Sequence, residues 1–229
     1  MKRALIVGGS RGLGLGLVGE HLKRGWHVTA TMRSSAPDLE ALARANSTRL
    51  SLERADVTRQ DEIVALADRL RSERYDLLFL NAGMMAGRNT ALADVPDDDI
   101  VSIFLTNAIS PVRVADRLIS TVAPGGTVAF MSSILGSIST NDDGRAELYR
   151  ASKAALNSLM LSFRARHRAG RPDLTVLAVH PGVVRTSMGG PSAPLDIATS
   201  VTGVSNVLEQ RAGSQGTYFV DYRNEIIPW

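Results

Sequence analysis

Short apolar runs alternate along this chain with longer segments whose apolar residues recur at helical spacing. The runs that read as strands lie at 3–8, 26–32, 48–53, 76–83, 126–133, 174–180 and 216–222. The segments that read as helices lie at 13–24, 38–46, 60–73, 97–121, 148–169 and 196–212. Several strand runs are apolar at nearly every position, which is typical of strands covered on both faces. The alternation therefore predicts an α/β fold, a doubly wound parallel sheet of about seven strands flanked by helices.

The composition fits one folded unit. The chain has 229 residues, of which 44% are hydrophobic and 21% charged, and no linker-like stretch divides it. We therefore expect a single domain over residues 1–229. The net charge of +3 comes from basic residues scattered along the chain. Because a nucleic-acid site usually needs such residues clustered, no nucleic-acid partner is expected.

The residues that the sequence lacks bear on the kind of site and on location. It has no cysteine, which excludes disulfides, thiolate metal ligands and cysteine nucleophiles. Its four histidines have no spacing that indicates paired metal ligands, so no metal site is predicted. The first apolar run is too short for a secretory signal, and no run is long enough to span a bilayer. We expect a cytoplasmic protein with no membrane partner.

The residues that follow the strands are the candidates for a site, because ligands of a doubly wound sheet bind beyond the carboxyl ends of its strands. In chain order these tips read "GGSRGLG", "MRSS", "ADVT", "NAG", "MSSILGS" and "HPGVVRTSMGG". They are rich in glycine, hydroxyl and amide groups, which is typical of a site built around a bound ligand.

The first tip has glycines where a dinucleotide needs them. Gly8, Gly12 and Gly14 lie between the first strand and the first helix, where the lack of side chains lets the backbone approach a pyrophosphate at the helix N-terminus. The residues expected to contact the dinucleotide here are Gly8, Ser10, Arg11, Gly12, Leu13 and Gly14. The alternative interpretation is an ordinary tight turn.

The second tip bears on the choice between the two nicotinamide cofactors. An NAD site usually has an acidic residue after the second strand, whereas this sequence has Arg33 there and Arg11 in the glycine loop. Two guanidinium groups can hold a ribose 2′-phosphate by charge-assisted bonds, which predicts NADP(H) over NAD(H). If both arginines are solvated surface charges instead, Asp38 is the acid that could support NAD.

The third and fourth tips are the expected adenosine contacts. Asp56 and the Val57 backbone can hold the adenine amino group. The small residues Asn81, Ala82 and Gly83 can pack against the adenosine ribose. Both tips could also be simple turns, since Asp and Asn-x-Gly favour turns.

Tyr149 and Lys153 stand four residues apart in a predicted helix, so their side chains share one face. A nearby ammonium favours the phenolate and lowers a tyrosine pKa from about 10 toward the range of a general acid or base. The spacing alone is common and usually means a surface pair. Here Ser133 ends the fifth predicted strand at the same sheet edge, and Asn107 lies in the helix before it.

Together these motifs resemble the short-chain dehydrogenase/reductase family along nearly the whole chain. The matching motifs, in the family's order, are "GGSRGLG", "ADVT", "NAG", Asn107, "MSS", "YRASK" and "HPGVVRT". Within the family, "MSSILGSIS", "YRASKAALN" and the closing "DYRNEIIPW" resemble the C-factor and sniffer-type carbonyl reductases. The resemblance implies a Rossmann-type fold.

The resemblance also implies a catalytic tetrad of Asn107, Ser133, Tyr149 and Lys153. Tyr149 would protonate a carbonyl oxygen that Ser133 orients. Lys153 would hold the nicotinamide ribose and keep the tyrosine pKa low, and Asn107 would anchor a water in the proton relay. The family seats the nicotinamide carboxamide against the loop after the sixth strand, which here contains Pro181, Gly182, Val184 and Thr186.

The implied function is reduction of an aldehyde or ketone to an alcohol with NADPH, a reversible hydride transfer. An alternative from another class is an NADP(H)-binding signalling protein with vestigial reductase activity. Sugar-nucleotide epimerisation or dehydration is disfavoured, because the chain lacks the added length that such substrates usually require. Relatives commonly pair through the helices at 97–121 and 148–169, so a homodimer or homotetramer is expected. The substrate and the physiological direction stay open.

The identity of the catalytic serine is a detail that stays open. The segment between Ser133 and Tyr149 is longer than in many relatives, which makes Ser132 and Ser137 competitors. Strand alternation lets only one of Ser132 and Ser133 face the cofactor, and the family's register favours Ser133.

The substrate side of the site is predicted from methionines and one short segment. Residues 188–195 are short for a lid and, with Met84 and Met85, predict an open, apolar and adaptable pocket. The alternative is that the methionines only fill gaps beneath loops. His180 has no motif role, so we expect it to be structural.

Overall fold

The computed structural model describes residues 1–88 and 90–229, and in them the predicted fold class is confirmed. Seven parallel strands form one sheet in the order β3-β2-β1-β4-β5-β6-β7 within this described part. The strands are β1 (Arg3–Val7), β2 (His27–Met32), β3 (Leu50–Arg54), β4 (Tyr75–Leu80), β5 (Val122–Met131), β6 (Thr175–His180) and β7 (Thr217–Asp221). The order reverses between β1 and β4, which is the switch point where such sheets bind ligands.

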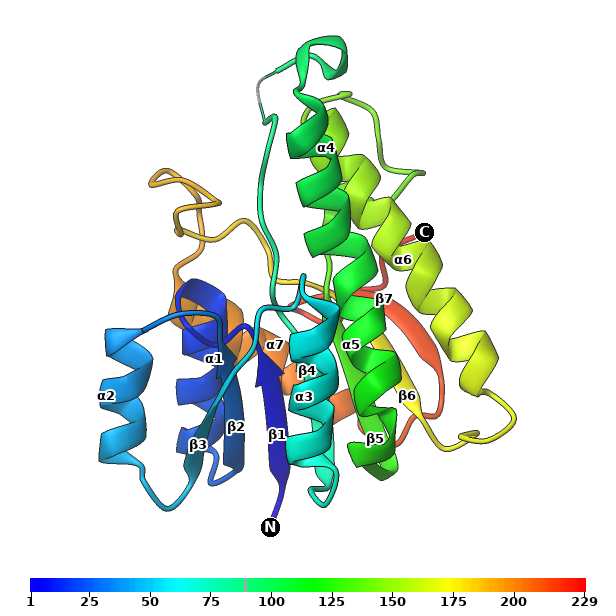
Figure 1. The fold of residues 1–229 in the computed structure, drawn as a ribbon. Coiled ribbons are helices and arrows are strands. Elements are labelled where there is room, and N and C mark those ends of the chain that lie inside the picture. The colour runs from blue at the N-terminus through cyan, green and yellow to red at the C-terminus, as the bar shows by residue number, and fades with distance from the viewer. Residues whose placement is uncertain (89) are drawn as a thin grey trace.

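Helices cover both faces of the sheet (Figure 1). They are α1 (Gly12–Lys23), α2 (Pro37–Ala45), α3 (Gln60–Leu70), α4 (Asp97–Phe104), α5 (Ser110–Leu118), α6 (Glu147–His167) and α7 (Ile197–Arg211). Side chains of α3, α5 and α6 form one buried core with one face of the strands, and side chains of α1, α2 and α7 form a second core on the other face. Strands buried on both faces explain the continuously apolar runs. Among the residues described, no helix is both long and apolar enough to cross a bilayer.

The helix predicted at 97–121 is interrupted. A π-helical segment, η2 (Leu105–Ile109), separates α4 from α5, although the three run on as one continuous rod, with α5 beside the strands and α4 extending beyond their ends (Figure 1). Pro111 in the first turn of α5 has no N–H to give to the carbonyl four residues before it, that of Asn107, which accounts for a change of helical pitch at this point.

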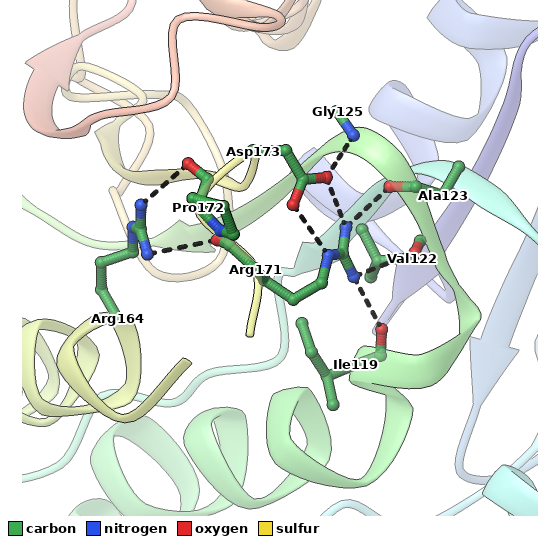
Figure 2. A network of polar contacts seen from close by, with 8 residues as sticks. All are labelled: Ile119, Val122, Ala123, Gly125, Arg164, Arg171, Pro172 and Asp173. Carbon is green, nitrogen blue, oxygen red and sulfur yellow. Dashed lines mark hydrogen bonds and ion pairs between the residues drawn. The ribbon is translucent and has the colours of Figure 1, made fainter. Parts of the chain in front are cut away.

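A network of hydrogen bonds and an ion pair joins two strands at the amino edge of the sheet, which lies opposite the polar tips. Figure 2 shows Arg171, which precedes β6, with its guanidinium directed at the carbonyls of Ile119, Val122 and Ala123 and at the carboxylate of Asp173. Asp173 in turn accepts a hydrogen bond from the Gly125 N–H at 2.5 Å. One arginine therefore holds the start of β5 against the start of β6, leaving the carboxyl edge for chemistry.

Candidate active site

The glycine loop is packed too closely for side chains at two of its glycines. A Cβ on Gly14 would lie 2.0 Å from the Gly8 carbonyl oxygen, and a Cβ on Gly8 would lie 2.8 Å from the Ala82 nitrogen. Asn81 donates its side-chain amide to the Gly8 carbonyl at 2.8 Å, and the Gly8 N–H donates to the Thr31 hydroxyl at 2.9 Å. The predicted glycine loop and the "NAG" tip therefore form one unit at the carboxyl ends of β1 and β4.

The N-terminus of α1 has the features of an anion site. Its N-cap residue, Arg11, makes no side-chain capping bond, and the first turn contains no acidic residue. The first N–H groups of the helix and the positive end of its dipole therefore have no negative side chain to satisfy them. A Cβ on Gly12 would meet only Thr186 Cγ2, at 3.9 Å, which brings the loop after β6 close to this helix end.

The two arginines predicted to read the 2′-phosphate are exposed on the tips that follow β1 and β2. Within the described residues, neither Arg11 nor Arg33 takes part in an ion pair with Asp or Glu. Asp38, the acid of the alternative interpretation, lies exposed in the first turn of α2.

Asp56 forms the turn that its residue type favours. Its Oδ1 accepts hydrogen bonds from the Thr58 N–H at 2.9 Å and the Thr58 hydroxyl at 2.7 Å. Burial acts to raise the pKa of Asp56, but these bonds and the charges of Arg33 and Arg59 outweigh it and lower the pKa. Asp56 and Arg33 are thus neighbours at one end of the site, where an adenosine group is predicted.

The four residues of the predicted tetrad are all buried at the carboxyl edge. Tyr149 and Lys153 lie one helical turn apart on α6, with the Lys153 nitrogen 5.8 Å from the centre of the Tyr149 ring. Lys153 donates to the Met131 carbonyl at the end of β5, at 2.9 Å. The helix therefore directs both side chains onto the sheet edge.

Asn107 reaches the same place from the π-helical segment. Its side-chain carbonyl accepts from the Met84 N–H and its amide donates to the Met84 carbonyl, both at 2.8 Å, while the amide also lies 3.1 Å from the Ser152 hydroxyl. A Cβ on Gly83 would lie 3.3 Å from the Asn107 side-chain oxygen and 3.7 Å from the Lys153 nitrogen. Gly83 thus brings asparagine and lysine together where the resemblance implies a bridging water.

The structure separates the three candidate serines. Ser133 is the candidate that acts on Tyr149, whose pKa it tends to lower, and its oxygen accepts from the Leu135 N–H at 3.2 Å. Ser132 donates instead to the Asn157 side chain at 2.8 Å, and the Ser137 hydroxyl lies 3.3 Å from that of Ser139. The geometry therefore favours Ser133 as the serine that acts with Tyr149.

The expected lowering of the Tyr149 pKa is wrong for this structure. Burial raises the pKa of Tyr149 to about 12, against the opposing effects of Ser133 and the charge of Arg88. Burial also lowers the pKa of Lys153 to about 8, so the ammonium is itself destabilised. Both shifts have one cause, the loss of water around charged groups, and it outweighs the one-turn spacing on which the expectation depended.

An apolar cluster surrounds Tyr149 beyond the sheet edge, and we call it the Tyr149 cluster. Its buried members are Val95, Ile103, Leu148 and Tyr149, and the partly buried residues packed on it are Met84, Met85, Ala86, Ile100, Phe104, Leu135, Ala146 and Met188. The methionines predicted to line the substrate side therefore lie beside Tyr149, together with Met188 of the predicted lid. An open pocket at this cluster stays a prediction.

The loop after β6 is held in a fixed shape by its own residues. Gly182 adopts φ +82°, and a Cβ there would lie 2.3 Å from Leu195, while Val184 forms a bridge with Leu195. The Pro181 carbonyl accepts from the Ser200 hydroxyl at 2.6 Å. Thr186 Oγ1 accepts from the Gly189 N–H at 3.0 Å. The residues predicted to hold the nicotinamide thus lie in a loop that its own hydrogen bonds stabilise and that faces the start of α1.

Arg88 is the residue near this site that sequence reasoning missed. It lies in the segment after "NAG", its guanidinium donates to the Met188 carbonyl, and its charge acts on Tyr149. The available signal was a single cation five residues beyond a ligand-binding tip, directly after the apolar run Met84, Met85, Ala86 and Gly87.

A doubly wound sheet with a dinucleotide-type glycine loop beside a buried tyrosine and lysine defines the class of Rossmann-fold oxidoreductases. Comparison with known proteins narrows this class to one family. The family described as short chain dehydrogenase matches residues 2–194, and the chain belongs to it.

Individual relatives agree with this assignment. The C-signal protein of Myxococcus xanthus is 37% identical over 169 residues, which are 72% of this chain and 99% of that protein. A structure from Burkholderia multivorans, described as a short-chain dehydrogenase/reductase with bound NADP, is 44% identical with a TM-score of 0.96 over 100% of this chain and 99% of that one. A carbonyl reductase from Pseudomonas aeruginosa in complex with NADP is 41% identical with a TM-score of 0.91 over 100% of both chains. The predicted likeness to C-factor and sniffer-type carbonyl reductases is confirmed.

Proposed function

We propose that this protein is an NADPH-dependent carbonyl reductase that converts an aldehyde or ketone into an alcohol. The observation that carries the proposal is the buried Tyr149 phenol, on whose pKa Ser133 acts and which lies one helical turn from Lys153, at the sheet edge that also holds the glycine loop. The NADP found with the Burkholderia and Pseudomonas proteins supports the choice of cofactor.

The residues present fit a phosphorylated dinucleotide. The uncapped N-terminus of α1 suits a pyrophosphate, and the exposed guanidinium groups of Arg11 and Arg33 suit a 2′-phosphate. Asp56, Val57 and Asn81 to Gly83 would hold the adenosine end, and Pro181, Gly182, Val184 and Thr186 the nicotinamide end. When bound, the nicotinamide supplies the hydride that adds to the carbonyl carbon.

The protein's own residues supply the proton. Because burial raises the pKa of Tyr149 to about 12, its phenol stays protonated near neutral pH and can donate to the carbonyl oxygen. Ser133 would hold that oxygen while the carbon gains hydride, and the oxygen would then take the phenolic proton to complete the alcohol. Lys153 and Asn107, whose side chains both lie beside Gly83, would return a proton to the tyrosine.

The test is NADPH oxidation, followed by absorbance, with a panel of aldehydes and ketones and with wild type and Tyr149→Phe side by side. We expect turnover to fall at least about a hundredfold in the variant, since it loses the proton donor but keeps the ring. NADPH binding, measured by fluorescence, should be retained, and NADH should bind more weakly than NADPH. A variant that turns over like wild type would contradict the role of Tyr149.

A second candidate is an NADP(H)-binding signalling protein, which the similarity to C-signal favours. Tight NADPH binding without reduction of any carbonyl on the panel would support this candidate. A cytoplasmic location, a single domain and a homodimer or homotetramer stay predictions, and size-exclusion chromatography with light scattering would test the last.

A further inference from the structure

Arg88 is positioned across the Tyr149 cluster by its neighbours. Gly87 adopts φ +59°, and a Cβ there would lie 3.2 Å from Val95 and 3.5 Å from Leu148, the residue before Tyr149. The next residue, Arg88, donates from its guanidinium to the Met188 carbonyl, so its side chain joins the segment after β4 to the loop after β6. Arg88 and Met188, a member of the Tyr149 cluster, are therefore in direct contact.

The charges around Arg88 do not neutralise it. Among the residues that the structure describes, no Asp or Glu forms an ion pair with Arg88. Two acids at the start of α6 and in the segment before it have other partners: Glu147 accepts from the Leu92 N–H at 3.1 Å, and Asp143 pairs with Arg145 and Arg150. A guanidinium has five N–H donors, and the Met188 carbonyl engages one end of this one.

We propose that Arg88 makes this reductase selective for carbonyl compounds that also carry a carboxylate. This inference rests on the proposed function and names its substrate class. The apolar Tyr149 cluster would receive the body of the substrate, Tyr149 its carbonyl oxygen, and Arg88 its carboxylate, by the forked geometry that suits guanidinium and carboxylate groups. If Arg88 only held the segment after β4 against the loop after β6, the enzyme would not distinguish carbonyl compounds with a carboxylate from those without one.

The experiment compares two ketones of the same shape, 4-acetylbenzoate and 4-acetylbenzamide, one anionic and one neutral. For wild type we expect kcat/KM to favour the benzoate, and in Arg88→Gln we expect that ratio to fall about tenfold or more, chiefly through KM. Arg88→Lys, which keeps the charge but not the fork, should retain part of the preference. Arg74→Gln, an exposed arginine at the amino edge of the sheet, controls for the loss of one positive charge.

The dependence on ionic strength separates a role of Arg88 in selectivity from a purely structural role. The benzoate preference should shrink as ionic strength rises, because an exposed charge pair is screened by salt. Equal losses for both ketones in Arg88→Gln would mean that Arg88 only holds the segments, and would overturn the proposal. A wild-type ratio that does not favour the benzoate would do the same.

A binding measurement distinguishes failure of this inference from failure of the proposed function. Both ketones are titrated into Tyr149→Phe loaded with NADPH, with and without Arg88→Gln, and binding is followed by cofactor fluorescence. Benzoate binding that depends on Arg88, with no turnover by wild type, would sustain the selectivity and refute the reductase. Turnover of both ketones without any Arg88-dependent difference in binding would sustain the reductase and refute the selectivity.

Discussion

At the scale of single residues, the site places a lysine where burial opposes its charge. Lys153 is buried, and its ammonium donates to a single backbone carbonyl, that of Met131. Burial lowers the pKa of Lys153 from 10.5 to about 8. Stability is therefore sacrificed at this position for a group whose predicted role is catalytic, as is common at functional sites.

The sign of the pH dependence follows from this shift. Above pH 10.5 Lys153 is neutral in both the folded and the unfolded chain, so it does not lower the free energy of unfolding. As the pH falls from 10.5 toward 8, Lys153 takes up a proton in the unfolded chain but not yet in the folded one, so the free energy of unfolding decreases. Below pH 8 Lys153 is protonated in both states, and the free energy of unfolding decreases no further on its account.

Lys153→Met should therefore stabilise the fold at pH 7 by about 1–3 kcal/mol while abolishing reductase activity. Urea unfolding at several values of pH measures the difference from wild type, which should shrink as the pH rises from 8 to 10.5. Lys23→Met, at an exposed position in the last turn of α1, is the control and should change stability little. A destabilised Lys153→Met at pH 7 would refute this account.

At the scale of elements, the turn from β1 into α1 depends on absent side chains. Gly14 lies in the first turn of α1 with the Gly8 carbonyl and the Asn81 amide where its Cβ would be. Gly19 lies further along the same helix, and no atom outside the helix is within 4 Å of the corresponding Cβ position. Replacing each glycine by alanine therefore distinguishes two effects on stability: close packing at Gly14 and helix propensity at Gly19.

Gly14→Ala should lower the free energy of unfolding by about 2–3 kcal/mol or more, because the backbone of the glycine loop must shift to admit the methyl group. Gly19→Ala should raise it by about 0.5–1 kcal/mol, since alanine restricts the unfolded chain and favours helix. Urea unfolding of both variants measures the contrast. Two changes of the same sign would show that the loop is not held as closely as the structure has it.

At the scale of the whole molecule, stability and chemistry lie at opposite edges of the sheet. The Arg171 network joins the segments that lead into β5 and β6 at the amino edge (Figure 2), while every residue of the candidate site lies at the carboxyl edge. A change at one edge is thus expected to leave the other intact.

Arg171→Ala should lower the free energy of unfolding by about 2–3 kcal/mol, because several backbone carbonyls lose a charged donor, with little change in kcat/KM. The hydrogen bonds from Arg171 and the Gly125 N–H lower the pKa of Asp173 to about 2, so the network should persist at pH 4 and be lost as the pH falls toward 2. Thermal unfolding beside Arg168→Ala, an exposed neighbour, measures the effect. Equal stability of the two variants would argue against the network.

Much of this architecture is determined by the sequence alone. Continuous apolar runs require strands covered on both sides, and their alternation with helices leaves few arrangements besides a doubly wound sheet. The parallel strands then bring "GGSRGLG", "NAG" and Ser133 to one edge, whatever the details of packing. These inferences succeed because the spacing of apolar residues and the order of the segments along the chain can both be read directly from the sequence.

Other features are decided only by the tertiary structure. The hydrogen bond from Ser132 to Asn157, which supports the prediction of Ser133, depends on a helix that lies further along the chain, and the reach of Arg88 depends on a loop a hundred residues further along the chain. The pKa of Tyr149 rises although the one-turn spacing to Lys153 predicted the opposite. The physical reason is common to all three: burial and partner choice arise from contacts between distant segments, and those exist only once the chain has packed.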